Sequence, residues 1–210
     1  MKIPLLIYGA GGLGREVLSL VRSFDKFEVI GFLDDNVPKG ALVKGVKVVG
    51  GREALHSADS PLNLVLALGD PGKKALLAGK IPASKVNYPV IQHPSVILQE
   101  TTTIMIGAGS ILCAGCVLTT DIEIGSHVLL NLNCTLGHDT RIGDFSSVMP
   151  GVNIAGEVKI GRSVLIGSGA NILNRVNIGD TSKVGMGSVV IHDVDPGITV
   201  AGVPAKQINK

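Results

Sequence analysis

Large aromatic side chains and an excess of charge of either sign are both nearly missing from this sequence. The 210 residues include no Trp, two Tyr and four Phe, and the formal net charge is only +2. Near-neutrality argues against nucleic acid as a main partner, because phosphate binding requires clustered Lys and Arg. A hydrophobic fraction of 45% without large aromatic anchors instead predicts a core of stacked aliphatic residues.

Long apolar runs are missing as well. No window approaches the roughly 18 consecutive apolar residues of a membrane-spanning helix. The opening segment MKIPLLIYGAGG reaches glycines too early for a secretory signal. We therefore expect a cytoplasmic protein that does not insert into membranes.

An unbroken hexapeptide repeat fills the second half of the chain. Steps of six from Ile106 to Val190 reach Ile, Leu or Val every time, and the fifth position of the hexads is mostly small or β-branched. The repeat predicts a three-sided parallel β-helix, in which three hexads make one coil and coils stack at about 4.8 Å. Glycines that recur once per coil are expected to relieve strain at the corners; they are Gly107, Gly125, Gly143, Gly161 and Gly179.

The three cysteines fit this repeat better than they fit a metal site. Cys113 and Cys116 have the spacing of a redox or zinc pair, but the sequence offers no ligand set that completes a structural zinc site. Cys116 and Cys134 are one coil apart at the same inward position. We expect them to stack in the core as free thiols, which suits a reducing compartment, and we expect no metal.

Residues 1–90 follow a different pattern, which predicts a small Rossmann-like α/β domain with a parallel sheet. Strands are expected in IPLLIY, EVIGFLDD, VKVVG and NLVLALG. Helices are expected in GLGREVLSLV, GREALHSA and DPGKKALLAGK. Alternating strands and helices favour a parallel sheet, and the all-β left-handed parallel β-helix would then occupy residues 91–210.

Glycines at the first strand–helix turn predict a phosphate-binding loop. The loop matches G-x-G-x-x-G, which lets the backbone approach a phosphate at a helix N-terminus. Ligands of such sheets bind at the carboxyl ends of the strands. The candidate residues for a nucleotide or nucleotide sugar are Gly9, Gly11, Gly14, Asp34, Asp35 and Gly69.

Two alternatives remain for this loop. Asp34 follows Gly14 at about the distance along the chain where a dinucleotide fold places a ribose-binding acid, so NAD is one alternative. A tight turn without a ligand is the other. The domain has only half the length of a two-lobed dinucleotide fold, which favours the nucleotide or nucleotide sugar.

One corner of the repeat carries an acid–base pair, His138 and Asp139. A positioned imidazole acts as a general base, and a neighbouring carboxylate fixes its tautomer. The register places His138 at a corner, and Gly156 holds the same corner one coil later, which leaves room for a ligand. His192 and Asp193 repeat the dipeptide in the same register three coils later. The dipeptide and its register are therefore not sufficient evidence for a base.

The remaining histidines have no supporting constellation. His56, His93 and His127 are expected to be structural, with His93 in the junction between the domains. His192 is expected at the surface or at the rim of a cofactor site.

Together the two halves resemble the bacterial hexapeptide-repeat sugar acetyltransferases, which include nucleotide-amino-sugar N-acetyltransferases and sialic acid O-acetyltransferases. The resemblance covers nearly the whole chain. It implies a homotrimer with acetyl-CoA as donor and with active sites in clefts between adjacent β-helices. The segments that carry it are GAGGLGREV, GFLDD, LNCTLGHDTRIGDF, MPGVNIAGEVKIG and VAGVPAK.

The resemblance also implies roles for individual residues. His138 would be the general base and Asp139 its partner, while Asn131 would lie near the acceptor sugar or merely cap a corner. Lys206 would meet a CoA phosphate or remain a solvated tail lysine. Ser147 stands where some relatives place a histidine beside the cofactor, so that contact is expected to be altered. The full set of expected cofactor-contacting residues is Ser147, Gly156, Ser168, Met186 and Lys206.

The expected activity is acetyl-CoA-dependent N-acetylation of a nucleotide-activated amino sugar for bacterial surface glycan synthesis, without a covalent acetyl-enzyme. O-acetylation of sialic acid or a similar sugar by the same base is the alternative. A non-catalytic trimer that uses the β-helix as a scaffold is an alternative from another class. An intact His138–Asp139 pair argues against the scaffold.

Overall fold

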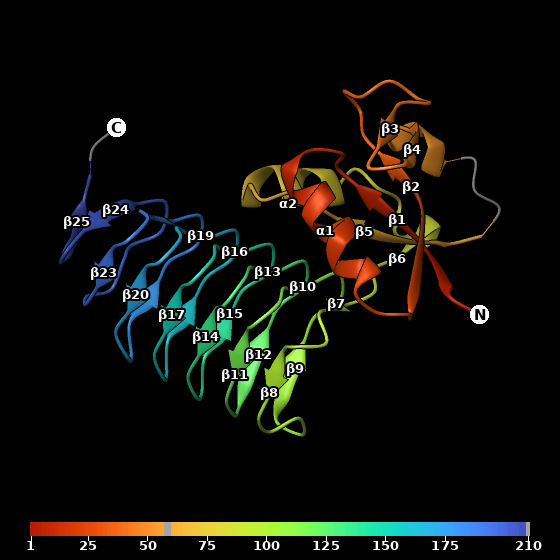
Figure 1. The fold of residues 1–210 in the computed structure, drawn as a ribbon. Helices are drawn as coiled ribbons and strands as arrows, with labels where there is room; N and C mark the ends of the chain where they lie inside the picture. Colours follow the sequence, from red (N-terminus) through yellow and green to blue (C-terminus); the bar gives the residue numbers. More distant parts are fainter. Residues whose placement is uncertain (57–59, 209–210) are drawn as a thin grey trace.

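The computed structural model describes residues 1–56 and 60–208. Figure 1 shows an α/β front domain seated against one side of a long β-solenoid. The front domain has one six-stranded sheet in the order β3-β4-β2-β1-β5-β6. Its elements are β1 (Ile3–Tyr8), α1 (Gly12–Arg22), β2 (Phe27–Leu33), β3 (Leu42–Val43), β4 (Val46–Gly50), η1 (Arg52–Leu55), β5 (Leu62–Leu66), α2 (Pro71–Ala78), η2 (Ala83–Lys85) and β6 (Val86–Asn87).

The strands expected in the front domain all form, and β1 pairs in parallel with both β2 and β5. The helices expected after the first and last of these strands form as α1 and α2. The helix expected in GREALHSA is only a single 3-10 turn, η1, and residues 57 and 58 of that segment lie outside the described residues. Leu55 is the only buried side chain of η1, so little apolar surface stabilises a longer helix.

Three sheets form the solenoid, parallel throughout except for the antiparallel pairing of the last two strands of the chain. Consecutive coils pair in register three hexads apart, as Leu118 does with Leu136. This confirms the predicted α/β domain followed by a hexapeptide β-helix. The first face contains β7 (Ile91–Gln92), β10 (Ile111–Leu112), β13 (Leu129–Leu130), β16 (Ser147–Val148), β19 (Leu165–Ile166), β22 (Lys183–Val184), β24 (Thr199–Gly202) and β25 (Ala205–Gln207). The second face contains β8 (Ile97–Leu98), β11 (Val117–Leu118), β14 (Thr135–Leu136), β17 (Asn153–Ile154), β20 (Asn171–Ile172) and β23 (Val189–Val190). The third face contains β9 (Ile104–Ile106), β12 (Ile122–Ile124), β15 (Arg141–Ile142), β18 (Lys159–Ile160) and β21 (Asn177–Ile178).

The inside of the solenoid is filled by the aliphatic repeat. From Leu112 to Val190 every sixth residue is at most 4% exposed. Cys116 and Cys134 are fully buried in the same core, which confirms their expected stacking.

The buried thiols make a testable prediction. Cys113, Cys116 and Cys134 are all free and buried, and burial raises the pKa of Cys113 to about 12. Because the thiolate is the reactive species, we expect a colorimetric thiol reagent to label none of them in the native protein and all three after denaturation. Rapid labelling of the native protein would contradict this packing.

Glycine is required at the five recurring corner positions for a different reason from the one expected. None of the five has a positive φ; the left-handed conformation falls two positions later, at residues such as Phe145 (φ 63°). A Cβ added to Gly143 would lie 2.7 Å from the carbonyl carbon of Gly161. Glycine is therefore required because adjacent coils approach closely there, and not because the backbone is strained.

The front domain covers the outer side of the first face. The outward residues Ile91, Ile111 and Leu129 are at most 2% exposed and share a hydrophobic cluster with Val17 and Leu18 of α1. We call the turns from the first to the second face the first corner, and those from the second to the third face the second corner. Because the solenoid has three sides, the second corner lies opposite the face that the front domain covers.

The helices are short. Within residues 1–56 and 60–208, none is long and apolar enough to cross a membrane.

Candidate active site

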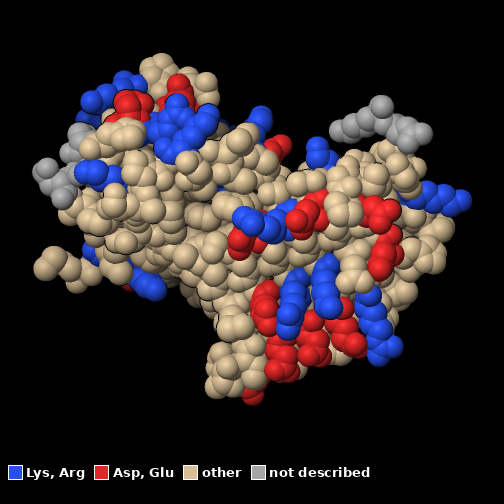
Figure 2. All heavy atoms as spheres, turned by 180° about the vertical axis from the view of Figure 1, so that it is seen from behind, with Lys and Arg blue, Asp and Glu red and all other residues tan. Residues whose placement is uncertain are grey.

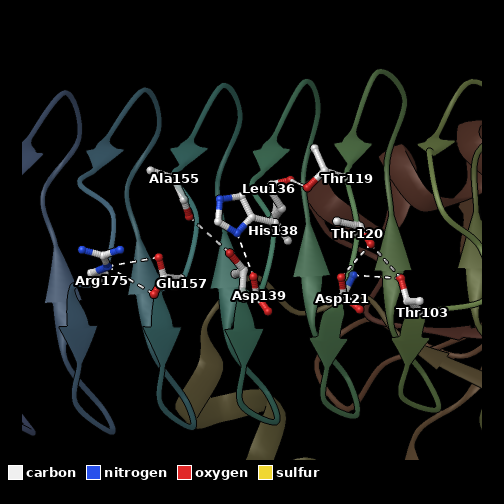
Figure 3. A network of polar contacts seen from close by, with 11 residues as sticks. Thr103, Thr119, Thr120, Asp121, Leu136, His138, Asp139, Ala155, Glu157 and Arg175 are labelled. Atoms are coloured by element: carbon white, nitrogen blue, oxygen red, sulfur yellow. Dashed lines mark hydrogen bonds and ion pairs between the residues drawn. The ribbon is translucent and has the colours of Figure 1, made fainter.

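His138 and Asp139 lie at the second corner between β14 and β15, with their side chains together (Figure 3). His138 Nδ1 is 2.8 Å from Asp139 Oδ2. This bond assigns the imidazole proton to Nδ1 and leaves Nε2 as the acceptor. Asp139 has a φ of 58°, a left-handed conformation that aspartate tolerates better than most residues. Both side chains are more than half exposed, so the pair is open to a ligand.

The His138 imidazole lies against Gly156, which holds the same corner in the next coil. A Cβ added to Gly156 would lie 2.5 Å from His138 Nε2. The Gly156 N–H has no acceptor among the described residues, whereas the Glu157 N–H donates to the His138 carbonyl at 2.7 Å. The second corner thus offers a proton acceptor and an unused backbone donor on adjacent coils.

The coil below supports this corner. The Asp139 N–H donates to the Thr120 carbonyl at 3.2 Å, and the Thr120 hydroxyl donates to Asp121 Oδ2 at 2.8 Å. The Thr103 hydroxyl lies 3.1 Å from that of Thr120, as Figure 3 shows. These bonds hold the backbone that carries His138.

The second His–Asp dipeptide adopts a different structure. Val194 bridges to Ile178, which is two positions short of a full coil. The Asp193 carboxylate accepts from the Asn177 N–H at 2.7 Å and from its side-chain amide at 3.1 Å. Asp193 is therefore bonded to the neighbouring coil and not to His192, so the repeated dipeptide forms no base–carboxylate pair.

The glycine loop lies at the carboxyl edge of the front sheet. Gly9 has a φ of 104°, and a Cβ on Gly14 would overlap the Gly9 carbonyl oxygen, so both positions require glycine. Gly11 has no atom within 4 Å of an added Cβ. The loop is thus open to a ligand at Gly11, directly before α1.

Asp34 and Asp35, which follow the carboxyl end of β2, accept hydrogen bonds from different segments. Asp34 Oδ2 accepts from the Ala10 N–H at 2.8 Å, and its Oδ1 accepts from the Asn36 and Val37 N–H groups. Asp35 Oδ1 accepts from the Arg52 N–H at 2.8 Å. Both aspartates line a cavity of about 340 Å³. Asp34 therefore ties the glycine loop to β2, and its backbone bonds disfavour the ribose-binding role of the NAD alternative.

Asn131 and Gly69 lie where the front domain meets the first corner. Asn131 is buried, and its Oδ1 accepts from the Leu132 N–H at 2.8 Å. It lines a mostly apolar cavity of about 270 Å³ with His93 and residues of α1. A Cβ on Gly69 would lie 3.7 Å from Met149 of the same corner. Asn131 thus caps its corner while facing the junction between the domains, where His93 was also expected.

The remaining expected cofactor contacts separate into accessible and inaccessible residues. Ser168 is half-buried, whereas Met186 and Lys206 are exposed. Ser147 is fully buried beneath α2, where its Oγ accepts from Lys74 Nζ at 3.1 Å. Ser147 was expected to contact a cofactor. The structure corrects this expectation, because the front domain covers the Ser147 side chain.

His127 and His56 lie away from the second corner. His127 is buried and stacks on Phe145 with ring centroids 5.2 Å apart, and Tyr88 packs edge-on at 4.5 Å. Burial lowers the pKa of His127 to about 4. His56 is exposed after η1.

Sequence motifs do not identify three charged residues that the structure places near the expected site or in the core. Glu157 and Arg175 follow Asp139 at the second corner in steps of one coil, and that step is the signal that finds them. Lys74 is only 2% exposed. No sequence signal separates it from the exposed Lys73 beside it.

Two known families match parts of the chain. The PglD N-terminal domain matches residues 4–81. The bacterial transferase hexapeptide family, described by six repeats, matches residues 139–174. A comparison with curated proteins by sequence found no match.

Several solved structures match the chain over its full length. The acetyltransferase domain of PglB from Neisseria gonorrhoeae FA1090 is 29% identical with a TM-score of 0.91, covering 99% of this chain and 100% of its own. A perosamine N-acetyltransferase from Caulobacter crescentus, solved with CoA and GDP-perosamine as a histidine-to-asparagine variant, is 28% identical with a TM-score of 0.91 and coverages of 99% and 97%. WeeI from Acinetobacter baumannii AYE is 30% identical with a TM-score of 0.86 and coverages of 99% and 100%.

Proposed function

Because the chain belongs to the bacterial hexapeptide-repeat sugar acetyltransferases, we propose that it transfers the acetyl group of acetyl-CoA to the amine of a nucleotide-linked sugar, with His138 as general base. The observation that carries this proposal is the 2.8 Å bond between His138 Nδ1 and Asp139, which leaves Nε2 of a mostly exposed imidazole as the proton acceptor. The full-length similarity to a perosamine N-acetyltransferase bound to GDP-perosamine supports an amine acceptor on a nucleotide sugar.

His138 removes the proton that the acceptor amine must lose. Its Nδ1–H donates to Asp139 Oδ2, so Nε2 presents its lone pair to the amine. A positioned base of this kind contributes about 10²–10⁴-fold to the rate. Asp139 stabilises the imidazolium that forms, and Nε2–H then protonates the departing CoA thiolate.

Gly156 fits the donor substrate at this corner. Acetyl-CoA supplies an activated acetyl thioester. The missing side chain of Gly156 lets the imidazole lie against the backbone of the next coil. The unbonded Gly156 N–H donates to the acetyl carbonyl oxygen as negative charge develops there. All three cysteine thiols are buried, so none is accessible as a nucleophile. The acetyl group is therefore transferred directly from acetyl-CoA to the amine.

A second copy of the chain completes the site in this proposal. Gly69 borders the first corner, whereas His138 lies at the second corner, opposite the covered face. In a homotrimer, the second corner of one subunit meets the first corner of the next. His138 then faces the Asn131 corner of its neighbour, and Ser168 and Met186 border the groove for CoA.

The test measures free-thiol release from acetyl-CoA with UDP-, GDP- and dTDP-linked amino sugars and with free sialic acid. We expect turnover with one class of nucleotide-linked amino sugar and none with sialic acid. Turnover only with sialic acid would replace the proposal with O-acetylation. No turnover with any acceptor, in a folded trimer, would contradict the proposed N-acetyltransferase.

A further inference from the structure

A column of charged residues runs along the second corner through His138's neighbours. Asp121, Asp139, Glu157 and Arg175 follow one another in steps of one coil, so each lies about 4.8 Å from the next along the solenoid. All four have positive φ values, from 54° to 66°. The column turns from acidic to basic one coil above Glu157.

Glu157 is joined to the His138–Asp139 pair on one side and to Arg175 on the other. Its N–H donates to the His138 carbonyl at 2.7 Å. Its carboxylate oxygens lie 3.0 Å and 3.2 Å from Arg175 Nε. In Figure 3, Glu157 points toward Arg175 and away from the imidazole, which leaves Asp139 as the carboxylate on Nδ1.

Charges of both signs surround the His138–Asp139 pair. Figure 2 shows acidic and basic side chains gathered in one block on the solenoid, where Asp139 borders a groove of about 740 Å³. Besides Asp139, three acidic and three basic side chains from the adjoining elements line this groove. They are Asp121, Glu123, Arg141, Glu157, Lys159 and Arg175.

We propose that Glu157 and Arg175 are positioning residues for the base: Arg175 holds the Glu157 carboxylate away from His138 and balances its charge. This inference rests on the proposed function, because it concerns the base of that reaction. Neither residue touches the reacting atoms. The pair keeps Asp139 as the single carboxylate partner of Nδ1 and sets the pH at which His138 becomes available as a base.

Opposite effects are expected when either member is removed. Arg175→Gln leaves the Glu157 charge unbalanced beside the imidazole, which favours the imidazolium, so His138 titrates at higher pH. Glu157→Gln leaves the Arg175 charge unbalanced, so His138 titrates at lower pH. Both shifts should shrink as the salt concentration rises from about 10 mM to about 1 M, because salt screens exposed charges.

The experiment follows the His138 imidazole by NMR as a function of pH in the full-length protein, with the signal assigned by its loss in His138→Asn. Relative to the wild type, we expect an upward shift in Arg175→Gln, a downward shift in Glu157→Gln and little change in the double variant. The acid limb of the kcat/KM profile with the active acceptor should move in the same directions.

Matched controls come from another ion pair. Arg162 and Asp144 lie 3.5 Å apart, away from the second corner, so Arg162→Gln and Asp144→Asn should leave the His138 midpoint unchanged. Equal shifts in the control variants, no shift in any variant, or shifts of one sign in both Arg175→Gln and Glu157→Gln would overturn the inference. The proposed function fails separately, if His138→Ala retains full acetyltransferase activity.

Discussion

Replacing Lys74 with Met is expected to stabilise the protein by about 1–3 kcal/mol at pH 7, since replacing buried charged groups by apolar ones of similar volume often stabilises. Lys74 is only 2% exposed. Its Nζ reaches the Ser147 hydroxyl at 3.1 Å and the Ser146 carbonyl at 3.5 Å, with no carboxylate bonded to it in the described part of the chain. Burial lowers the pKa of Lys74 to about 7, against an opposing effect of Asp70.

The pH dependence of the free energy of unfolding identifies the buried Lys74 charge as the cause of this stabilisation. Between pH 7 and about 10.5 the unfolded chain holds the Lys74 proton more tightly than the folded protein does. The free energy of unfolding therefore rises with pH in this window by up to about 1.4 kcal/mol per unit and is flat below it. Lys74→Met should remove that rise. His127, whose pKa is lowered to about 4, affects a separate window between pH 4 and 6.5, where stability falls as pH falls.

Urea unfolding from pH 6 to pH 10 measures the stabilisation by Lys74→Met and the loss of the rise with pH. Lys73→Met is the matched control. Lys73 is the exposed neighbour on α2, so its replacement should change the free energy of unfolding by less than about 0.5 kcal/mol. A destabilised Lys74→Met protein with an unchanged pH slope would show that the Lys74 charge is well compensated in the fold.

A methyl group at Gly156 is expected to reduce acetyl transfer by about 10²-fold or more, the contribution of a positioned general base. The added Cβ would lie 2.5 Å from His138 Nε2, so the imidazole must swing away from its bond to Asp139. Gly156 has no positive φ, so alanine suits its backbone. The N–H is retained, which isolates the position of the base from the oxyanion donor.

A double-mutant cycle tests whether the added methyl group acts by displacing the His138 imidazole. If Gly156→Ala acts through the imidazole, it should add little to the loss in His138→Ala, because two changes to one interaction are not additive. Additive losses in kcat would show that Gly156 acts independently of His138. Thermal unfolding of each variant separates a displaced base from a damaged fold.

The solenoid was predictable because one physical requirement recurs at every sixth residue. Each inward aliphatic position, such as Leu136, stacks on its equivalent in the next coil, so the pattern carries the fold directly. The role of the glycines was less predictable. Sequence alone does not distinguish a positive φ from a close approach between backbones, and at Gly143 the second cause holds.

The site was predictable only where the register is regular. His138 and Gly156 share a corner as the one-coil step predicts. At Asp193 the step fails, because the chain shortens the corner and the carboxylate bonds to Asn177. Ser147 was misjudged for another reason. Its burial depends on where the front domain docks, a long-range contact that no local pattern encodes.

The most direct test compares the maximal rate of acetyl transfer in the wild type, His138→Ala and His192→Ala. The two histidines belong to the same dipeptide on the same solenoid, but only His138 is bonded to its aspartate and lies against a glycine of the next coil. We expect a loss of about 10²-fold or more in His138→Ala and a near-normal rate in His192→Ala. A near-normal rate in His138→Ala, or equal losses in both variants, would contradict the assignment of the base.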